Sequence, residues 1–397
     1  MTRRHLLLLA AQAGFAKLSL AKASLGSPGQ LIREFGEQGD HRTGTAVDIA
    51  SGNWLMEQVR KAGLTPSREF FGLNRVDPVT GTLTLGDSRV EGLPLFDGAF
   101  TGERGVSGRL GPINSDAPIG WVEAAPNTAA AGPLGEARRQ NRHKAIIVVT
   151  RGGRPGLCPN NADDFLKPFG PPVLQLSTED RAILQNGASV TVMAQARRTQ
   201  TTAFNVTARI QGHDRKLPPL IVMTPRSGWW SCAGERGGGI VCWLQLMQAL
   251  KAAKPARDVL FVASSGHEVG YLGIEAFVAK RPGIVKRAHA WIHFGANVGA
   301  ALNPTNTVQA SDDDMESRDA AAISAAGLPV GRRVPRGTVP NGEAGVVHKG
   351  GGRYLSLIGG NGLFHNPKDR GPEAIDETAI NRLEAAFSEV AKALAGA

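Results

Sequence analysis

Four polar or glycine-rich segments of the chain directly follow short apolar runs that are typical of strands. They cover residues 224–239, 264–270, 292–297 and 363–370. The histidine, glutamate, arginine and serine residues in these segments can transfer a proton, hold a metal ion or bind a carboxylate. The sequence therefore predicts that the chemistry of this protein is carried by side chains placed just beyond the ends of strands.

A glycine run with two nearby arginines could form an anion-binding site. Gly237–Gly239 lies beside the start of a predicted helix, where backbone N–H groups attract negative charge. Arg226 and Arg236 are close in sequence and could bind a carboxylate or a phosphate. The alternative is a tight turn that lets Trp229 and Trp230 pack beneath the loop. In either case, we expect this loop to line a pocket.

Two other kinds of site are disfavoured by the residues around them. Ser227 and Cys232 follow a predicted strand, but the G-x-S-x-G elbow of many serine hydrolases is absent. The acidic run Asp312–Asp314 lacks the glycine and the terminal glutamate of a calcium-binding loop, and it is typical of a solvated turn. We therefore expect neither a Ser or Cys nucleophile nor a calcium site.

The segments that must position the polar side chains alternate between strands and helices from residue 204 onward. Apolar runs predict strands at residues 220–224, 259–263, 289–293 and 354–358. Longer periodic stretches predict helices at residues 239–253, 271–280, 317–326 and 376–395. This alternation predicts an α/β fold, a three-layer sandwich around a mostly parallel mixed sheet. Ligand sites in such folds lie beyond the carboxyl ends of the strands, where the polar segments fall.

The first half of the chain is less regular. Residues 42–64 predict a helix, and alternating runs between 70 and 93 predict strands joined by turns at Asp77-Pro78 and Gly86-Asp87. Loops rich in Gly, Pro, Ala and Asn then surround strand-like runs and indicate a β-rich insert. We therefore divide the chain, after its N-terminal signal, into residues 24–94 and 202–397 of a main domain and an insert at 95–201.

The N-terminus is typical of an export signal. Arg3 and Arg4 precede the apolar run Leu6–Ala16, which is too short to span a bilayer, and Ala21-Lys22-Ala23 is a small-residue cleavage pattern. The paired arginines resemble a twin-arginine signal. An amphipathic first helix is the alternative. We expect residues 1–23 to direct the protein to the periplasm or to secretion.

Composition limits the partners. The formal net charge is +10, but Lys and Arg are spread along the chain without a basic stripe among aromatics, so no nucleic-acid partner is expected. Three cysteines without CxxC spacing cannot build a disulfide framework. No later segment has the length of a transmembrane helix, so we expect no stable membrane insertion. The sequence leaves the oligomeric state open.

Several motifs, in this order and spacing, resemble the di-zinc aminopeptidase family, which includes glutamate carboxypeptidase and, more distantly, the glutaminyl cyclases. Phe204–Gly212 resembles the strand that opens the family's catalytic domain. Gly266–Gly273 is similar to its Glu-Glu-x-Gly-x-x-Gly motif, and Phe364–Asp369 resembles its closing Tyr-His-Thr-Pro-x-Asp motif. The insert, with Ala145–Gly152 and Pro172–Leu176, looks like a protease-associated domain. The resemblance covers nearly the whole mature chain and implies a peptidase.

The chain departs from the family at several ligand positions. Pro225 and Ser227 stand where the family has His-x-Asp, and Gly295 aligns with a further ligand Asp, so a full di-zinc centre is not expected. The resemblance to glutaminyl cyclases implies instead a single zinc ion, and its three protein ligands would be Glu235, Glu268 and His365. A water molecule would complete four-coordination.

His267 stands at the position of the family's general-base Glu, and an imidazole suits proton transfer near neutral pH. The alternatives are structural: His267 or Glu268 could cap a helix, and Glu235 could pair with Arg236. The catalytic roles that we predict belong to His267, Arg236 and His293. The substrate-binding residues that we predict are Arg226, Ser227, Trp229, His348 and Arg353.

Two functions follow from these residues. The first is an exported metallopeptidase-like hydrolase that acts on a peptide or small amide with at most one zinc ion. The second is a binding protein for peptide or anionic ligands that keeps the fold and has lost metal chemistry.

Overall fold

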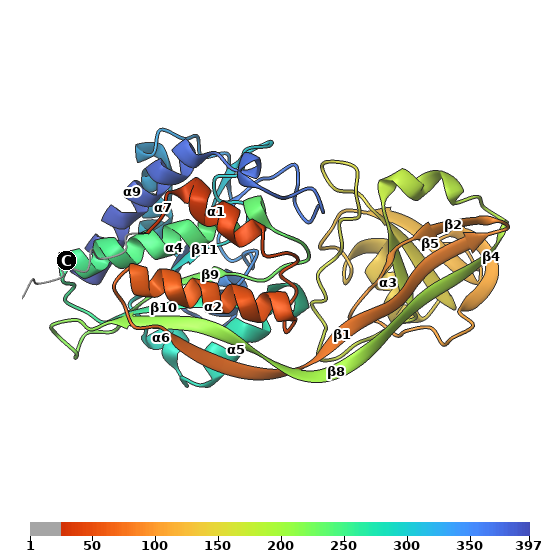
Figure 1. The fold of residues 1–397 in the computed structure, drawn as a ribbon, viewed down its shortest axis with the longest axis horizontal. Helices are drawn as coiled ribbons and strands as arrows, with labels where there is room; N and C mark the ends of the chain where they lie inside the picture. Colours follow the sequence, from red (N-terminus) through yellow and green to blue (C-terminus); the bar gives the residue numbers. More distant parts are fainter. Residues whose placement is uncertain (1–24) are drawn as a thin grey trace, which may run out of the picture.

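The computed structural model describes residues 25–397, and the predicted export signal over residues 1–23 lies outside them. Figure 1 shows a larger and a smaller body that are joined by two long, neighbouring strands. These strands are β1 (Ser67–Leu85) and β8 (Ser189–Ile210), which pair in antiparallel fashion along most of their length. No helix of the described residues is long and apolar enough to cross a membrane.

The sheet of the larger body is mixed and mostly parallel. Its strand order is β13-β12-β14-β11-β9-β10-β8, and the four central strands from β14 to β10 run parallel. β12 and β8 flank them in antiparallel orientation. The strands not yet placed are β9 (Leu220–Pro225), β10 (Val259–Ser264), β11 (Ala290–Phe294), β12 (Asn306–Ala310), β13 (Arg332–Arg333) and β14 (Tyr354–Gly359). The prediction of an α/β fold with a mostly parallel mixed sheet is confirmed.

Helices cover both faces of this sheet because its central strands are apolar on both sides. Leu220 and Val222 of β9 pack into one core, whereas Ile221 and Met223 pack into the other. On the first face lie α1 (Pro28–Gly36), α2 (Ala46–Lys61), α4 (Ala233–Ala253), α7 (Asp313–Ala325) and α9 (Glu377–Ala395). On the second face lie α5 (Leu272–Ala279), α6 (Ile284–Arg287) and α8 (Ala344–Lys349).

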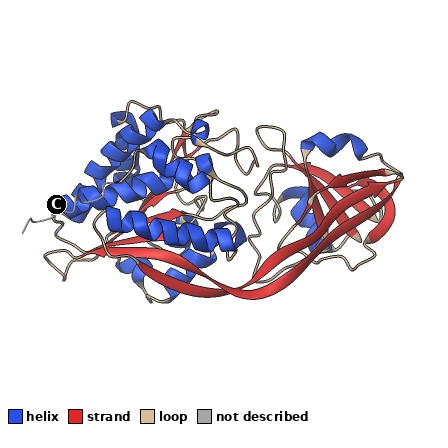
Figure 2. Ribbon diagram, viewed as in Figure 1, coloured by secondary structure: helices blue, strands red, loops and turns tan. Residues whose placement is uncertain are grey.

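The smaller body is rich in strands, as predicted for the insert (Figure 2). It holds β2 (Ser88–Glu91), β3 (Leu93–Pro94), β4 (Val106–Pro112), β5 (Ile119–Ala124), α3 (Gly132–Gln140), β6 (Ala145–Thr150) and β7 (Val173–Leu176). Its core also takes Leu83 from β1 and Val192 from β8. Both long strands therefore contribute to two cores. As a result, residues on either side of the domain boundary predicted between residues 94 and 95 pack together.

The predicted turn at Asp77-Pro78 is wrong, because β1 continues through it as one strand. Proline cannot donate a ladder hydrogen bond and is tolerated in a strand at an edge or a bulge. The β1–β8 register shifts between Pro78 and Thr80, which is the irregularity that accommodates the proline. The turn at Gly86-Asp87 is confirmed, and Gly86 has the positive φ that such a turn requires.

The glycine run Gly237–Gly239 lies inside α4 and not before it, so neither the anion-binding loop nor the tight turn predicted from it exists. The helix begins six residues earlier than predicted, at Ala233. A side chain at Gly238 would collide with the Val298 carbonyl oxygen, 1.8 Å from the added carbon. The run is therefore needed for close packing of α4 against the segment after β11.

His41 is a buried ring between α1 and α2. It is stacked on Phe35, with ring centroids 3.9 Å apart, and it is fully shielded from solvent. Among the described residues, neither ring nitrogen has a hydrogen-bond partner. Burial lowers the pKa of His41 to about 3.

This ring should make folding acid-sensitive. Below its unfolded pKa of about 6.5, the unfolded chain binds a proton that the folded chain excludes, so stability falls as pH drops toward 3. Between pH 7 and pH 5 we expect His41 to account for a loss of about 2 kcal/mol in the free energy of unfolding. The variant His41→Phe keeps the stacking on Phe35 but cannot bind a proton. Its free energy of unfolding should therefore fall by about that much less between pH 7 and pH 5, as measured by urea unfolding at both pH values. Replacement of the exposed His213 by Phe is the control, and an identical acid loss in wild type and His41→Phe would contradict the assignment.

Candidate active site

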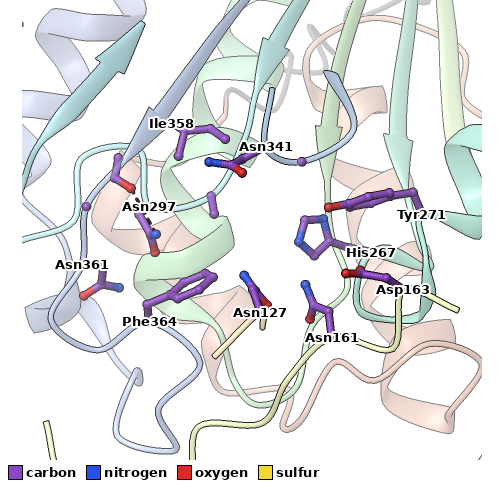
Figure 3. A pocket seen from close by; sticks show the side chains of 14 residues that line it. Asn127, Asn161, Asp163, His267, Tyr271, Asn297, Asn341, Ile358, Asn361 and Phe364 are labelled. Carbon is purple, nitrogen blue, oxygen red and sulfur yellow. Dashed lines mark hydrogen bonds between the residues drawn. The ribbon is translucent and has the colours of Figure 1, made fainter. Parts of the chain in front are cut away.

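A cavity of about 460 Å³ lies beyond the carboxyl ends of the parallel strands (Figure 3). Loops that follow β10, β11 and β14 form one part of its lining. The turn before α8 adds Asn341 and Gly342, and the smaller body supplies Asn127, Asn161 and Asp163. Three of the four polar segments that follow strands thus meet at the cavity, as predicted, whereas residues 224–239, which were also expected to line a pocket, do not line it.

Five asparagines give the cavity its chemical character, namely Asn127, Asn161, Asn297, Asn341 and Asn361. Each amide offers both hydrogen-bond donors and an acceptor, which is complementary to peptide groups and other neutral polar groups. Trp229 Nε1 donates to Asn161 Oδ1 at 3.0 Å, and the amide N–H₂ of Asn161 is thereby left for a ligand. In Figure 3 these side chains surround the cavity on several sides.

Three residues of the lining have a positive φ although they are not glycine. Asn127, Tyr271 and Asn297 have φ values of 67°, 60° and 66°. Asparagine adopts this conformation at small cost, but tyrosine does so only where its surroundings enforce it. Strained backbone of this kind concentrates at functional sites. The conformation of Tyr271 therefore supports the cavity as a site.

His267 is held at the cavity by a buried glutamate that the sequence analysis missed. Its Nδ1 lies 2.9 Å from Glu343 Oε1, and Tyr271 packs edge-on against the ring with centroids 5.2 Å apart. Figure 3 shows His267 between Tyr271 and Asp163. Among the described residues, the other ring nitrogen, Nε2, has no hydrogen-bond partner. Because a carboxylate can only accept, Nδ1 carries the proton of the neutral ring and Nε2 is left as a base.

Glu343 is shared by two histidines. Its second oxygen lies 3.3 Å from Nε2 of His293, and His293 Nδ1 contacts Ser356 Oγ at 2.8 Å. Burial raises the pKa of Glu343, but His267 and His293 outweigh burial and hold that pKa well below its usual value. Glu343 is thus a charged carboxylate. His293 is fully buried and does not line the cavity, so its predicted catalytic role is corrected to one of holding Glu343.

Behind the cavity, Glu235 and His365 meet as predicted, but their partner is Arg236. Glu235 Oε1 lies 2.7 Å from Arg236 Nη2 and 3.4 Å from His365 Nε2. Burial raises the pKa of Glu235, and the charges of Arg236 and His365 outweigh it and lower that pKa. Arg236 is fully buried and is not part of the cavity lining, so its predicted catalytic role is corrected to that of a charge partner of Glu235.

Glu268 does not join Glu235 and His365. Its Oε1 accepts from the Thr43 backbone N–H at 2.6 Å, and its Oε2 accepts from Ser227 Oγ at 2.8 Å. Among the described residues, no three His, Cys, Asp or Glu side chains are grouped so that they could hold a metal ion. The predicted three-ligand zinc site is therefore not formed. Only Glu235 and His365 remain close together, and the guanidinium of Arg236 already contacts the Glu235 oxygen that would bind the ion. These two donors therefore do not fit zinc.

Arg226 is a structural residue rather than a substrate-binding one. It is fully buried, donates to Asp48 Oδ1 at 2.7 Å and donates to the Phe204 carbonyl at 2.6 Å. Asp48 Oδ2 in turn accepts from the Gly44 N–H at 2.9 Å. The pair links α2 to the end of β9, and it is out of reach of a ligand in the cavity.

The other predicted substrate-binding residues also lie outside the cavity lining. Ser227 accepts from the N–H groups of Gly266 and His267 and orders that turn, and Trp229 acts only through Asn161. His348 contacts the Tyr354 hydroxyl at 3.2 Å. Arg353 precedes β14, at the opposite end of the strand from the cavity, and pairs with Asp312 and Asp314. His348 and Arg353 precede β14, and residues before a strand lie at the other edge of the sheet. Ser227 and Trp229 follow β9 at the correct edge, but both side chains are buried in the interior.

Glu343 and the asparagines carry little signal in the sequence. Glu343 directly precedes α8, a helix of six residues that was not predicted. Asn341 belongs to the same turn, and its N–H donates to Gln309 Oε1 at 2.8 Å. The only indication in the sequence was a carboxylate within the polar turn Asn341-Gly342-Glu343. We expect site residues directly after strands, and this turn does not directly follow a predicted strand.

Solved structures share this fold over nearly the whole chain. BSAP, a zinc aminopeptidase from Bacillus subtilis, matches with a TM-score of 0.73 and 19% identity, covering 91% of this chain and 93% of that one. A peptidase M28 precursor from Shewanella amazonensis SB2B matches with a TM-score of 0.69 and 13% identity, covering 95% and 94%. An aminopeptidase from Aneurinibacillus sp. strain AM-1 matches with a TM-score of 0.66 and 15% identity, covering 91% and 92%.

These similarities establish the fold, which confirms the predicted resemblance to zinc aminopeptidases at that level. No protein-family model matches the sequence. No curated protein matches it either.

The buried pair of Arg226 and Asp48 should be critical for stability. Asp48→Ala leaves the Arg226 charge without a counter-ion, and we expect a loss of about 3–5 kcal/mol in the free energy of unfolding, measured by urea denaturation. Glu389→Ala is the control, because Glu389 pairs with Lys392 at the surface and its loss should change stability little. If Asp48→Ala were as mild as this control, the structural role of Arg226 would be wrong.

Proposed function

Starting from the fold shared with zinc aminopeptidases, we propose that this protein is a peptidase-like hydrolase that acts on a peptide or a small amide in the asparagine-lined cavity. The observation that carries the proposal is the His267–Glu343 contact of 2.9 Å at the cavity. It fixes the tautomer of His267 and leaves Nε2 as a base. His267 stands at the position where the resemblance puts a general base.

The proposed reaction uses side chains of this chain alone. His267 Nε2 takes a proton from a water molecule as the water oxygen attacks the carbonyl carbon of the bound amide. Amide N–H groups of the cavity asparagines donate to the carbonyl oxygen as it becomes negative. The proton held on His267 then passes to the leaving nitrogen as the C–N bond breaks. Glu343 stabilises the imidazolium formed between these two steps.

Two further cavity groups support an amide or peptide ligand. Burial raises the pKa of Tyr271, so its hydroxyl stays protonated and can donate. Burial also raises the pKa of Asp163, and the carboxyl group can accept from a ligand N–H. Because Asp163 belongs to the smaller body, that body would take part in substrate binding.

The location of the protein is part of the same proposal. We propose export to the periplasm or secretion through the twin-arginine-like signal at residues 1–23, which the basic start, short apolar run and cleavage pattern support. The smaller body would correspond to a protease-associated domain. Its contribution of Asn161 and Asp163 to the cavity supports a role in ligand access.

A second candidate function is ligand binding without catalysis. The observation in its favour is that the zinc ligand set is incomplete and that none of the described cavity residues is Ser, Thr or Cys. In that case the asparagines would bind a peptide or an anionic ligand that is released unchanged.

A panel of aminoacyl and dipeptidyl p-nitroanilides, assayed with the mature chain, tests the proposal. On any substrate that is turned over, His267→Asn should lower kcat by about 10²–10⁴-fold with little change in KM, because it removes the base and keeps the contact shape. His348→Asn is the matched control and should retain activity, since His348 lies outside the cavity lining. Equal kcat values for wild type and His267→Asn would refute the catalytic assignment. Peptides that raise the Tm of wild type without being hydrolysed would establish the binding function instead.

A further inference from the structure

Three buried side chains behind the cavity meet at one carboxylate oxygen. Glu235, Arg236 and His365 are each exposed by 1% or less. The guanidinium lies 2.7 Å and the imidazole 3.4 Å from the same atom, Glu235 Oε1. A buried carboxylate requires a counter-charge at close range, and here it is Arg236 that provides it.

The spacing of Glu235 and His365 is what a shared metal ion would require. Two atoms each about 2.0 Å from one zinc ion lie roughly 3.3 Å apart in tetrahedral geometry. In the described part of the chain, Glu235 Oε1, Arg236 Nη2 and His365 Nε2 all lack a regular hydrogen bond, so the two short distances to Oε1 are close contacts without hydrogen-bond geometry. The two donors therefore have the arrangement of metal ligands, although a third ligand is missing and Arg236 lies against one of them.

Arg236 also connects the loops that a metal ion would otherwise connect. Its Nε donates to the Ser227 carbonyl at 2.7 Å, in the loop after β9 where the resemblance places ligands of a metal centre. Through Glu235 it reaches His365, in the loop after β14. Arg236 lies in the first turn of α4, where a positive side chain is disfavoured by the helix dipole. Its position is therefore explained by the acids around it and not by the helix.

The surrounding charges keep Arg236 ionised. Burial lowers the pKa of a guanidinium, but the carboxylates of Glu235, Glu343 and Glu268 outweigh burial and raise the pKa of Arg236. This buried cation contacts Glu235, and the charges of Glu343 and Glu268 also favour its ionised form. A divalent cation at Glu235 would face this positive charge at close range, with only one carboxylate and one imidazole to hold it.

We propose that the guanidinium of Arg236 is the resident cation of this site and takes the place of a metal ion between Glu235, His365 and the loop after β9. The folded protein is then independent of zinc, and Arg236 masks a latent pair of zinc ligands. This inference concerns the charge balance of the site and stands whether or not the cavity hydrolyses a substrate.

Metal content and thermal stability test it directly. Mature protein should be produced with zinc in the medium and purified without chelators, then analysed for bound metal and for Tm with and without EDTA. We expect wild type to contain no stoichiometric zinc and to show no change of Tm with EDTA. Stoichiometric zinc in wild type that is lost in Glu235→Gln, together with a Tm lowered by EDTA, would overturn the proposal.

Removal of the guanidinium should uncover the latent site. Arg236→Ala should show a rise of Tm with added ZnCl₂ that wild type lacks, and Arg236→Ala/His365→Ala should lose that rise. Arg370→Ala is the matched control, because Arg370 is an exposed arginine near the same loop and its loss should create no response to zinc. An Arg236→Ala protein that responds to zinc no more than this control would contradict the masking of the ligand pair.

A neutral pair keeps the proposal testable if Arg236→Ala does not fold. Arg236→Met leaves Glu235 as a buried charge with only His365 beside it, whereas Glu235→Gln/Arg236→Met removes both charges at similar volume. We expect the double variant to have a clearly higher urea midpoint than Arg236→Met. A double variant no more stable than the single one would show that Arg236 is not the counter-ion of Glu235, and the proposal would fail.

Discussion

The need to balance buried carboxylates governs the structure at the carboxyl ends of the strands. Glu343 is charged because two imidazoles contact it, and Glu235 is charged because Arg236 and His365 contact it. An unpaired charge in such buried surroundings would be strongly destabilising, so each of these groups depends on its partners for stability. The positions of His267 at the cavity and of the loops behind it both follow from this pairing.

The fold and the polar site depend on different interactions. Parallel strands covered by helices on both faces depend on apolar side chains such as Ile221 and Val222, which need no metal ion. The loops beyond the strands depend instead on their polar partners. There, Glu268 bonds to Ser227 and Thr43, and Arg236 supplies positive charge. The shared fold therefore does not by itself fix the chemistry at this edge of the sheet.

The smaller body is integrated with the site through backbone contacts of a short segment. The Ala162 N–H donates to the Glu268 carbonyl at 2.8 Å, and His365 Nδ1 contacts the Pro159 carbonyl at 2.6 Å. The paired strands β1 and β8 connect the two bodies on the other side (Figure 1). The cavity is consequently formed by two bodies that share strands and hydrogen bonds, and Asn161 and Asp163 are presented by a tethered segment.

The sequence by itself determined the alternation of strands and helices after residue 204, the β-rich insert and the edge of the sheet where polar side chains gather, because apolar periodicity and turn residues are local signals. It also selected His267, Glu235 and His365 as site residues. It did not determine which charges pair. Glu268 turns to Thr43, 225 positions away in the chain, and His267 pairs with Glu343, 76 positions away. Such partners are chosen by how loops far apart in sequence pack in three dimensions, so only the tertiary structure decided that the guanidinium of Arg236 contacts Glu235.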